Sequence, residues 1–248
     1  MPEPNTLGLP PTFREHLDED DVRRNSTLQS FAALEPQLER LYENRDNIDV
    51  IVDVGCGGGG FVRALGAYLD AGTIYGIEPD DELRAMASDR GIETFDVDVE
   101  NESLPFEDGT VDLVLAFGLV EHLRYYDPLF ESTREVIEHG WFWIAAPNLA
   151  SWVNRFALLT GHQPRNVEVS HNQAVGTLPI YDADSFLDHV HAPTYKALCE
   201  LLETYKFEPV ETVALSPYQR NRLARLLDGL FHLRVSWARR VAILAEKR

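Results

Sequence analysis

Short apolar segments alternate with helical patterns through the middle of the chain. The segment Asp49 to Val54 is rich in β-branched residues and precedes a glycine run, which predicts a strand buried on both faces. The pattern predicts further strands at 73–77, 93–97, 111–117 and 141–146, separated by helices at 61–69, 81–88 and 128–138. Strands that alternate with helices indicate a doubly wound α/β sheet.

The pattern changes on either side of this region. Residues 1–24 are rich in proline and acidic residues and have no period, so we expect a loose N-terminal arm before one domain at 25–248. The domain opens with a predicted helix, whose apolar residues recur every three or four positions: Leu28, Phe31, Leu34, Leu38 and Leu41. After Pro147 the alternation stops, and 148–193 reads as an irregular insert. Helices at 194–205 and 219–233 and strands at 207–214 and 240–246 complete the expectation.

The charge balance argues against several partners. The 248 residues include 41 acidic and 22 basic side chains, a formal net charge of −19. A surface this negative repels phosphate backbones and anionic lipid, so we expect no nucleic-acid partner. No apolar run is long enough to cross a bilayer, so we expect no stable membrane insertion. The first residues lack the basic and apolar regions of a signal peptide, which favours a cytoplasmic location.

Two explanations of the acidity stay open. One is adaptation to concentrated salt, by analogy with haloarchaeal proteins, and the other is a cationic partner. The acidic residues are scattered along the chain, and their densest cluster, Asp18 to Asp21, is short, which favours salt adaptation.

A glycine-rich loop, Gly55 to Gly60, follows the first predicted strand and opens a helix. Its glycines fit the dinucleotide pattern G-x-G-x-x-G and also, with Asp53, the pattern D-x-G-x-G-x-G. An acid two residues before the first glycine is badly placed for a pyrophosphate and well placed for a sulfonium or amino group. The alternative is a turn required only for close packing of helix on sheet.

Two further acids follow the next predicted strands. Glu78 lies after the second strand, where a carboxylate can accept both ribose hydroxyls of an adenosine. Asp98 lies after the third strand, where a carboxylate can accept a hydrogen bond from an adenine amine, and we prefer it to Asp96. The alternative for Glu78 is a solvated charge at the end of a strand.

Four segments carry a family resemblance: DVGCGGGGF, YGIEPD, DVDVENESLPFEDGTVDLVLAFGLVEHL and GWFWIAAPN. Together they resemble the class I S-adenosylmethionine-dependent methyltransferases, and most closely their small-molecule branch (methyltransferase type 11/23-like). The resemblance implies a Rossmann-like sheet of seven strands, whose antiparallel last strand lies between the fifth and sixth. It also implies S-adenosylmethionine as the cofactor.

The resemblance assigns site residues as well. Asp53 and the loop glycines match the groups around the methionine end, Glu78 the ribose acid, and Asp98 the adenine acid. The full set implied for the cofactor is Asp53, Gly55, Cys56, Gly57, Gly59, Glu78, Pro79, Asp98, Val99, Phe117 and Leu119.

The implied reaction is in-line displacement of the sulfonium methyl by a nucleophile, in which the enzyme contributes mainly proximity and alignment. His122 is a candidate general base, although the Glu-His pair of this branch also packs near the cofactor without moving a proton. His171, in the insert, is the second catalytic candidate. Related ubiquinone-type enzymes carry E-x-x-E-H and use a metal; Gly118 replaces the first of these acids, so we expect no metal.

The sequence therefore predicts a methyltransferase that acts on a small-molecule or lipid-like acceptor, as a monomer or homodimer. Two rivals remain: a catalytically inactive S-adenosylmethionine-binding subunit and an NAD-dependent oxidoreductase. The apolar stripe of 223–231 is either core or subunit contact or, with its flanking arginines, a lipid-binding helix.

Overall fold

The computed structural model describes residues 10–17, 33–170, 172–179, 188–215 and 222–247. A seven-stranded sheet forms its centre, in the order β3-β2-β1-β4-β5-β7-β6. The strands are β1 (Val50–Val54), β2 (Thr73–Ile77), β3 (Glu93–Phe95), β4 (Leu113–Phe117), β5 (Gly140–Pro147), β6 (Glu208–Leu215) and β7 (Arg240–Lys247). All pairs from β3 to β5 are parallel, and β7 runs antiparallel between β5 and β6. The predicted Rossmann-like fold is confirmed.

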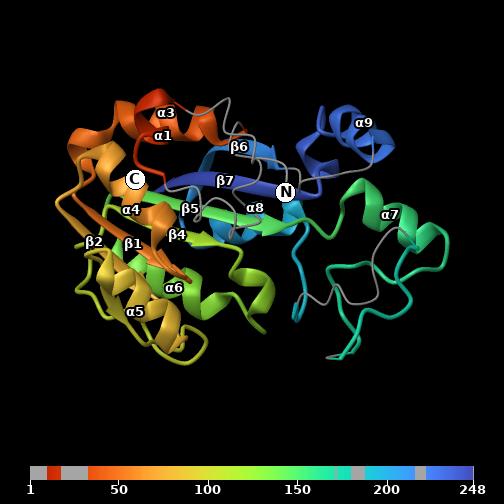
Figure 1. The fold of residues 1–248 in the computed structure, drawn as a ribbon, viewed down its shortest axis with the longest axis horizontal. Coiled ribbons are helices and arrows are strands. Elements are labelled where there is room, and N and C mark those ends of the chain that lie inside the picture. The colour runs from red at the N-terminus through yellow and green to blue at the C-terminus, as the bar shows by residue number, and fades with distance from the viewer. Residues whose placement is uncertain (1–9, 18–32, 171, 180–187, 216–221, 248) are drawn as a thin grey trace.

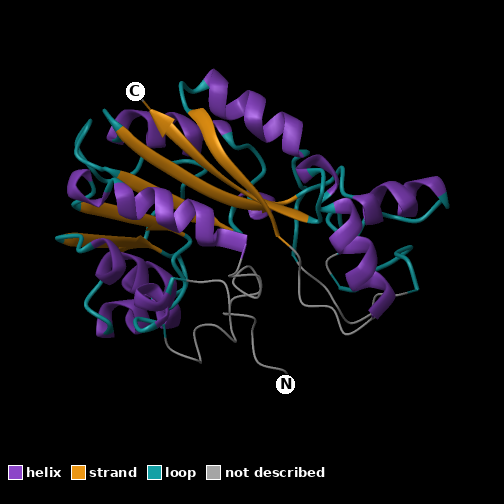
Figure 2. Ribbon diagram, turned by 90° about the horizontal axis from the view of Figure 1, so that it is seen from above, coloured by secondary structure: helices purple, strands orange, loops and turns teal. Residues whose placement is uncertain are grey.

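Helices cover both faces of this sheet (Figures 1 and 2). One face packs on α3 (Glu35–Glu43) and α4 (Gly60–Leu69), and the other on α6 (Asp127–Val136) and α8 (Tyr195–Thr204). The central strands β4 and β5 are apolar on both faces, because side chains alternate along a strand and both sides of these strands are covered. The remaining α-helices of the described chain are α1 (Pro11–Arg14), α5 (Asp81–Asp89), α7 (Trp152–Leu159) and α9 (Arg222–Phe231).

Three differences from the sequence expectation have physical causes. β3 ends at Phe95 rather than 97, because its only neighbour β2 ends at Ile77, which pairs with Phe95. The insert contains α7, which begins after the capping residue Ser151. The sequence pattern did not predict this helix, because the segment mixes polar and apolar residues without a clear period. Part of the expected loose arm is packed, since Phe13 of α1 is fully buried against Phe61 and Tyr68. Leu28 and Phe31 of the predicted first helix lie outside the described residues.

One buried polar side chain ties α3 to the sheet. The amide of Gln37 donates to the carbonyl oxygens of Glu211 and Ala242, at 3.0 and 2.9 Å, and its oxygen accepts from the indole of Trp143 at 2.8 Å. Gln37 is fully buried, so these bonds satisfy groups that would otherwise be unpaired in the core. The helix is thereby joined to β5, β6 and β7 at once.

Within the described chain, no helix is both long and apolar enough to cross a membrane.

Candidate functional site

The glycine loop lies where the strand order reverses. β1 is flanked by β2 and β4, so the loop after β1 occupies the edge at which doubly wound sheets bind ligands. Gly55, Gly57 and Gly59 all have positive φ, at 79°, 55° and 75°. A side chain on Gly59 would approach Ile92 within 2.3 Å, whereas one on Gly57 would meet nothing within 4 Å. Gly59 therefore serves packing, and Gly57 borders open space.

Glu78 holds this loop from the tip of β2. Its Oε2 accepts from the Gly57 amide at 2.9 Å, and its Oε1 accepts from the Asp80 amide at 3.0 Å. The side chain is 8% exposed. The carboxylate thus lies against the loop glycine that borders the open space, which is the position expected for an acid that contacts a bound nucleoside.

Asp53 and Cys56 are buried around the loop. Burial, and then the charge of Glu78, raises the pKa of Asp53 to about 7. The Cys56 thiol packs on β2, because a side chain at Gly76 would come within 2.5 Å of its sulfur. Burial and the neighbouring carboxyl groups raise the pKa of this thiol far above its ordinary range, so it is not a reactive cysteine.

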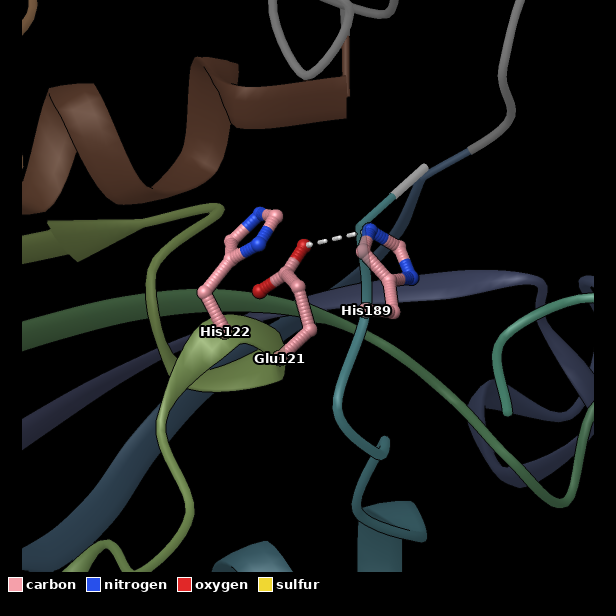
Figure 3. A group of neighbouring side chains, drawn as sticks. All are labelled: Glu121, His122 and His189. Carbon is pink, nitrogen blue, oxygen red and sulfur yellow. Dashed lines mark ion pairs between the residues drawn. The ribbon is translucent and has the colours of Figure 1, made fainter. Parts of the chain in front are cut away.

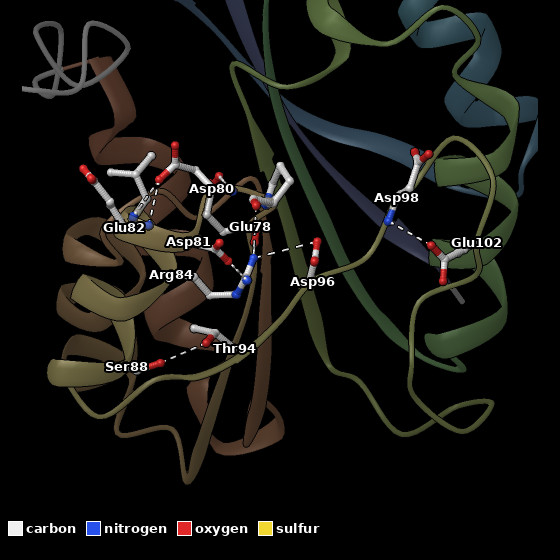
Figure 4. A network of polar contacts seen from close by, with 12 residues as sticks. Glu78, Asp80, Asp81, Glu82, Arg84, Ser88, Thr94, Asp96, Asp98 and Glu102 are labelled. Carbon is white, nitrogen blue, oxygen red and sulfur yellow. Dashed lines mark hydrogen bonds and ion pairs between the residues drawn. The ribbon is translucent and has the colours of Figure 1, made fainter.

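Apart from Glu78, the acids that closely follow β2 and β3 in Figure 4 are exposed, and several of them organise local turns. Asp98 accepts from the Glu100 amide at 3.1 Å and from the Asn101 side chain at 2.8 Å. Asp96 instead lies 3.8 Å from the Arg84 guanidinium, which also donates to the Glu78 carbonyl. The carboxylate of Asp98 is therefore held by local hydrogen bonds, and that of Asp96 lies near a guanidinium; the choice of Asp98 as the adenine acid stays a prediction.

Of the other predicted cofactor residues, some lie beside the glycine loop and others belong to the hydrophobic core. Leu119 faces the loop, since its Cδ1 would lie 3.4 Å from a side chain on Gly55. Pro79 is exposed beside Glu78, and Val99 is buried. Phe117 contacts the rings of Phe61 and Trp143, at centroid distances of 5.3 and 4.9 Å, so its ring belongs mainly to the core.

These residues fit S-adenosylmethionine. Burial and the neighbouring charge of Glu78 disfavour ionisation of Asp53, and a ligand with sulfonium and ammonium groups would offset that cost. The open space beside Gly57 allows a ligand to approach the backbone closely.

A second cluster lies just beyond β4, in the short helix η3 (Val120–His122) (Figure 3). Nδ1 of His122 lies 2.8 Å from the carbonyl oxygen of Asp188. A carbonyl only accepts, so Nδ1 carries the proton and Nε2 has the free lone pair. The His122 ring meets the ring of His189 edge-on, with centroids 5.0 Å apart.

Glu121 is buried between cationic and neutral neighbours. Its Oε1 lies 3.3 Å from Nη2 of Arg240 and 3.9 Å from Nε2 of His189. Its Oε2 has no hydrogen-bond partner among the described residues. Burial, followed by the electrostatic effect of His122 and of the guanidinium groups of Arg240 and Arg165, lowers the pKa of His189 to about 3. His189 is therefore neutral near pH 7, and Arg240 is the group that balances the charge of Glu121.

The same cluster has the composition of a metal site. One ligand atom each from Glu121, His122 and His189 lies within 4.8 Å of the others. The sequence did not suggest His189 as a third ligand, because it is 67 residues from His122 and the insert lacks a pattern. The nearby guanidinium of Arg240 already neutralises the only carboxylate, which disfavours a divalent cation.

Other candidate residues of the insert have structural roles or lie outside the described part. His191 stacks on Tyr126 and contacts the Arg124 carbonyl at 3.0 Å. Asn148 is fully buried, where its amide donates to the carbonyl oxygens of Ser236 and Ala238. His171, the second catalytic candidate, lies outside the described residues.

Comparisons with known proteins agree with this geometry. Residues 52–144 match the family model described as "Methyltransferase domain". Among solved structures, an S-adenosylmethionine-dependent methyltransferase from Mesorhizobium loti is 17% identical, with a TM-score of 0.57 over 87% of this chain and 98% of that one. One from Methanosarcina mazei is 16% identical, with a TM-score of 0.55 over 81% and 93%.

A third solved structure adds a partner for a protein of this fold. It is a complex between the Haloferax volcanii Trm112 methyltransferase activator and a methyltransferase. The matched chain is 14% identical to this one, with a TM-score of 0.51 over 86% of this chain and 94% of that one. The comparison with curated proteins gave no match. The family match, which spans the glycine loop, Glu78 and Asp98, assigns residues 52–144 to the methyltransferase domain family. The chain therefore carries a match to a methyltransferase domain at residues 52–144, and it shares the fold of solved S-adenosylmethionine-dependent methyltransferases.

Proposed function

We propose that this enzyme methylates a small-molecule or lipid-like acceptor by in-line displacement at the carboxyl edge of the sheet. When bound, the cofactor supplies a methyl group on a positively charged sulfur. Asp53, Glu78 and the loop glycines would bind the cofactor, and Asp98 would accept from its adenine. Leu119 would form part of the wall between the cofactor loop and η3.

The single observation that supports a catalytic role is the contact of His122 Nδ1 with the Asp188 carbonyl, from which we infer the tautomer of His122. Because Nδ1 is committed to the Asp188 carbonyl, Nε2 is free to take a proton from an acceptor hydroxyl or amine. The edge of the neutral His189 ring packs on His122 and restricts its rotation. His122 is also exposed, as a base that meets an incoming acceptor must be.

The test uses a labelled methyl donor and untargeted metabolite and lipid extracts to find an acceptor. With that acceptor, His122→Gln should lower turnover roughly 10²–10⁴-fold, the usual contribution of general acid–base catalysis, and leave S-adenosylhomocysteine affinity unchanged. His139→Gln is the matched control, because His139 is exposed and precedes β5 at the opposite edge of the sheet. Unchanged turnover in His122→Gln would rule out the base and leave a packing role.

The same preparation tests the rivals. Calorimetric titration with S-adenosylmethionine, S-adenosylhomocysteine and NAD should show binding of the first two only. Binding without transfer to any acceptor would favour the inactive subunit. Turnover should survive treatment with a chelator, and its loss would assign Glu121, His122 and His189 to a metal.

Several expectations from the sequence remain part of this proposal. His171→Ala should reduce turnover without weakening cofactor binding. We also propose a cytoplasmic monomer or homodimer without a nucleic-acid partner, from a halophile.

A further inference from the structure

An apolar surface remains on α7 and α9 that neither the core nor the site uses. We define the α7–α9 lobe as α7, α9 and Leu233. Figure 1 shows both helices beyond the carboxyl end of β5, at the end of the molecule away from α5. Of the six exposed leucines in the described chain, five belong to this lobe, and Phe156 is exposed there too. The leucines are Leu158, Leu159, Leu226, Leu230 and Leu233.

The outward direction of these leucines is fixed by well-formed contacts on the inner side. Asp228, which is buried, accepts from the Trp152 indole at 2.8 Å and from Arg239 Nε at 2.7 Å. Phe231 stacks between Trp152 and Trp237, with centroids 5.4 and 5.3 Å away. The inner side of α9 is therefore occupied.

The outer side follows helical spacing. Leu226 and Leu230 are four residues apart on α9, so they share one face of the helix, and they are 70% and 58% exposed. Leu233, in the turn after α9, is 82% exposed. On α7, Leu159 is 84% exposed. A helix with polar and aromatic anchors on one side and leucines in water on the other is typical of a binding face.

The distribution of basic residues indicates which kind of partner binds this face. The segments 148–165 and 219–240 contain eight of the chain's 22 basic residues and one of its 41 acidic residues. Arg239 and Arg240 pair with the buried carboxylates of Asp228 and Glu121, and the other six basic residues leave these segments positive in a chain with a net charge of −19. Arg155 and Arg234 are exposed there. Arginines that flank an apolar helical face match an anionic bilayer, whose headgroups attract the guanidinium groups while the leucines enter the acyl boundary.

We propose that the α7–α9 lobe docks this enzyme on an anionic lipid bilayer. Docking is peripheral and reversible, so it differs from the membrane insertion that the sequence argues against. The overall negative charge repels anionic lipid, and docking therefore depends on the local positive charge of the lobe outweighing that repulsion at the contact. The lobe adjoins the site through two consecutive residues, because Arg239 contacts Asp228 of α9 and Arg240 contacts Glu121. The inference rests on the proposed function, because docking would bring the enzyme to a lipid-like acceptor. Its test measures vesicle binding and not methyl transfer, so the docking proposal and the proposed function can fail independently of each other.

The test is co-sedimentation of the full chain with phosphatidylglycerol-containing vesicles and with pure phosphatidylcholine vesicles. We expect binding to the anionic vesicles only, and weaker binding as KCl is raised. Leu226→Asp should weaken binding roughly tenfold or more, as expected for withholding one leucine from the apolar phase. Tyr125→Asp is the matched control, because Tyr125 is 67% exposed and lies outside the lobe.

Charge is tested in parallel. Arg234→Glu should weaken binding to anionic vesicles, whereas Arg14→Glu on α1, equally exposed but remote, should not. Leu233→Asp, beyond the end of α9, is a second apolar variant, and circular dichroism checks that each variant is folded. Absence of vesicle binding, or equal losses in control and lobe variants, would overturn the proposal. A dimer that Leu226→Asp dissociates, without vesicle binding, would assign the face to a second copy instead.

Discussion

Arg240, the first residue of β7, lies 3.3 Å from the buried carboxylate of Glu121, which follows β4. The two residues are 119 positions apart, and nothing in their local sequences pairs them. The contact supplies the positive charge that a carboxylate with 1% exposure requires.

Removing that charge should destabilise the fold. We expect Arg240→Met to lower the free energy of unfolding by about 3 kcal/mol, because it leaves a buried carboxylate without its partner. Denaturant titration measures the change. Arg134→Met is the control, since its ion pair with Glu135 is exposed and should be worth less than about 1 kcal/mol. Equal effects of the two variants would contradict the role assigned to Arg240.

The loop glycines should separate binding from stability. Gly57→Ala should weaken S-adenosylmethionine binding, because its methyl group enters the open space beside the loop. Its positive φ adds a cost of about 1–2 kcal/mol to the fold. Gly91→Ala is the matched control, since Gly91 also has positive φ and no neighbour within 4 Å but lies after α5. Calorimetry and thermal unfolding measure both effects, and equal loss of affinity in the two variants would refute the assignment.

Gly59→Ala should behave differently. The added methyl group would lie 2.3 Å from Ile92, so overpacking adds about 1–3 kcal/mol to the cost of the backbone conformation. We expect a lower unfolding midpoint than in Gly57→Ala. A midpoint equal to that of Gly57→Ala would show that the packing of Gly59 against Ile92 is looser than the distance indicates.

Asp53 should make stability depend on pH. Its pKa is raised from 3.8 to about 7, so the folded state favours the protonated form. The stabilisation is present below pH 4 and is lost as the pH rises to about 7. The difference in unfolding free energy between wild type and Asp53→Asn should therefore change across this range and be constant above it. A constant difference at every pH would exclude a raised pKa.

The affinity for S-adenosylmethionine should depend on pH in the opposite direction to the stability. The ionised Asp53 is the form that stabilises a cationic ligand, so S-adenosylmethionine affinity should rise as the pH approaches about 7 and then level off. Titrations in buffers with different ionisation enthalpies should detect proton release on binding, and Asp53→Asn should abolish it.

Salt should stabilise the protein. At a net charge of −19, repulsion opposes the folded state, and raising KCl shortens the Debye length from about 10 Å at 0.1 M to about 3 Å at 1 M. The unfolding midpoint should rise over this range. Sucrose at matched osmolality is the control, because it is excluded from the surface without screening charge. A flat response to KCl would argue for the cationic-partner explanation of the acidity.

Periodicity was sufficient to predict the sheet. Every strand from β1 to β7 was predicted within about two residues. The clearest cases are β1, β4 and β5, because a strand buried on both faces leaves a continuous apolar run between turn residues. The order of the strands, by contrast, came from the family resemblance, since a local pattern does not state which strand β7 joins.

The site was predictable where it depends on the order of motifs along the chain. Gly57 and Glu78 meet because both follow adjacent parallel strands, and the sequence places both at strand ends. The contacts of Glu121 with Arg240 and His189 depend on how the insert and β7 fold back, which local patterns do not encode. The burial of Phe13 was not predicted for the same reason, because its partners on α4 lie about fifty residues away along the chain.

The three bonds of Gln37 set the limit of any shortened form of this protein. The family match begins at residue 52, but a truncation there would remove α3 and the start of β1, and with them the three bonds that join the helix to β5, β6 and β7. Each such bond contributes about 0.5–1.5 kcal/mol, and the apolar face that Leu38 and Leu41 cover would be exposed to water as well. We therefore expect the smallest piece that folds to start upstream of Glu35, and a fragment trimmed to the matched residues to lose the fold on which nucleoside binding depends.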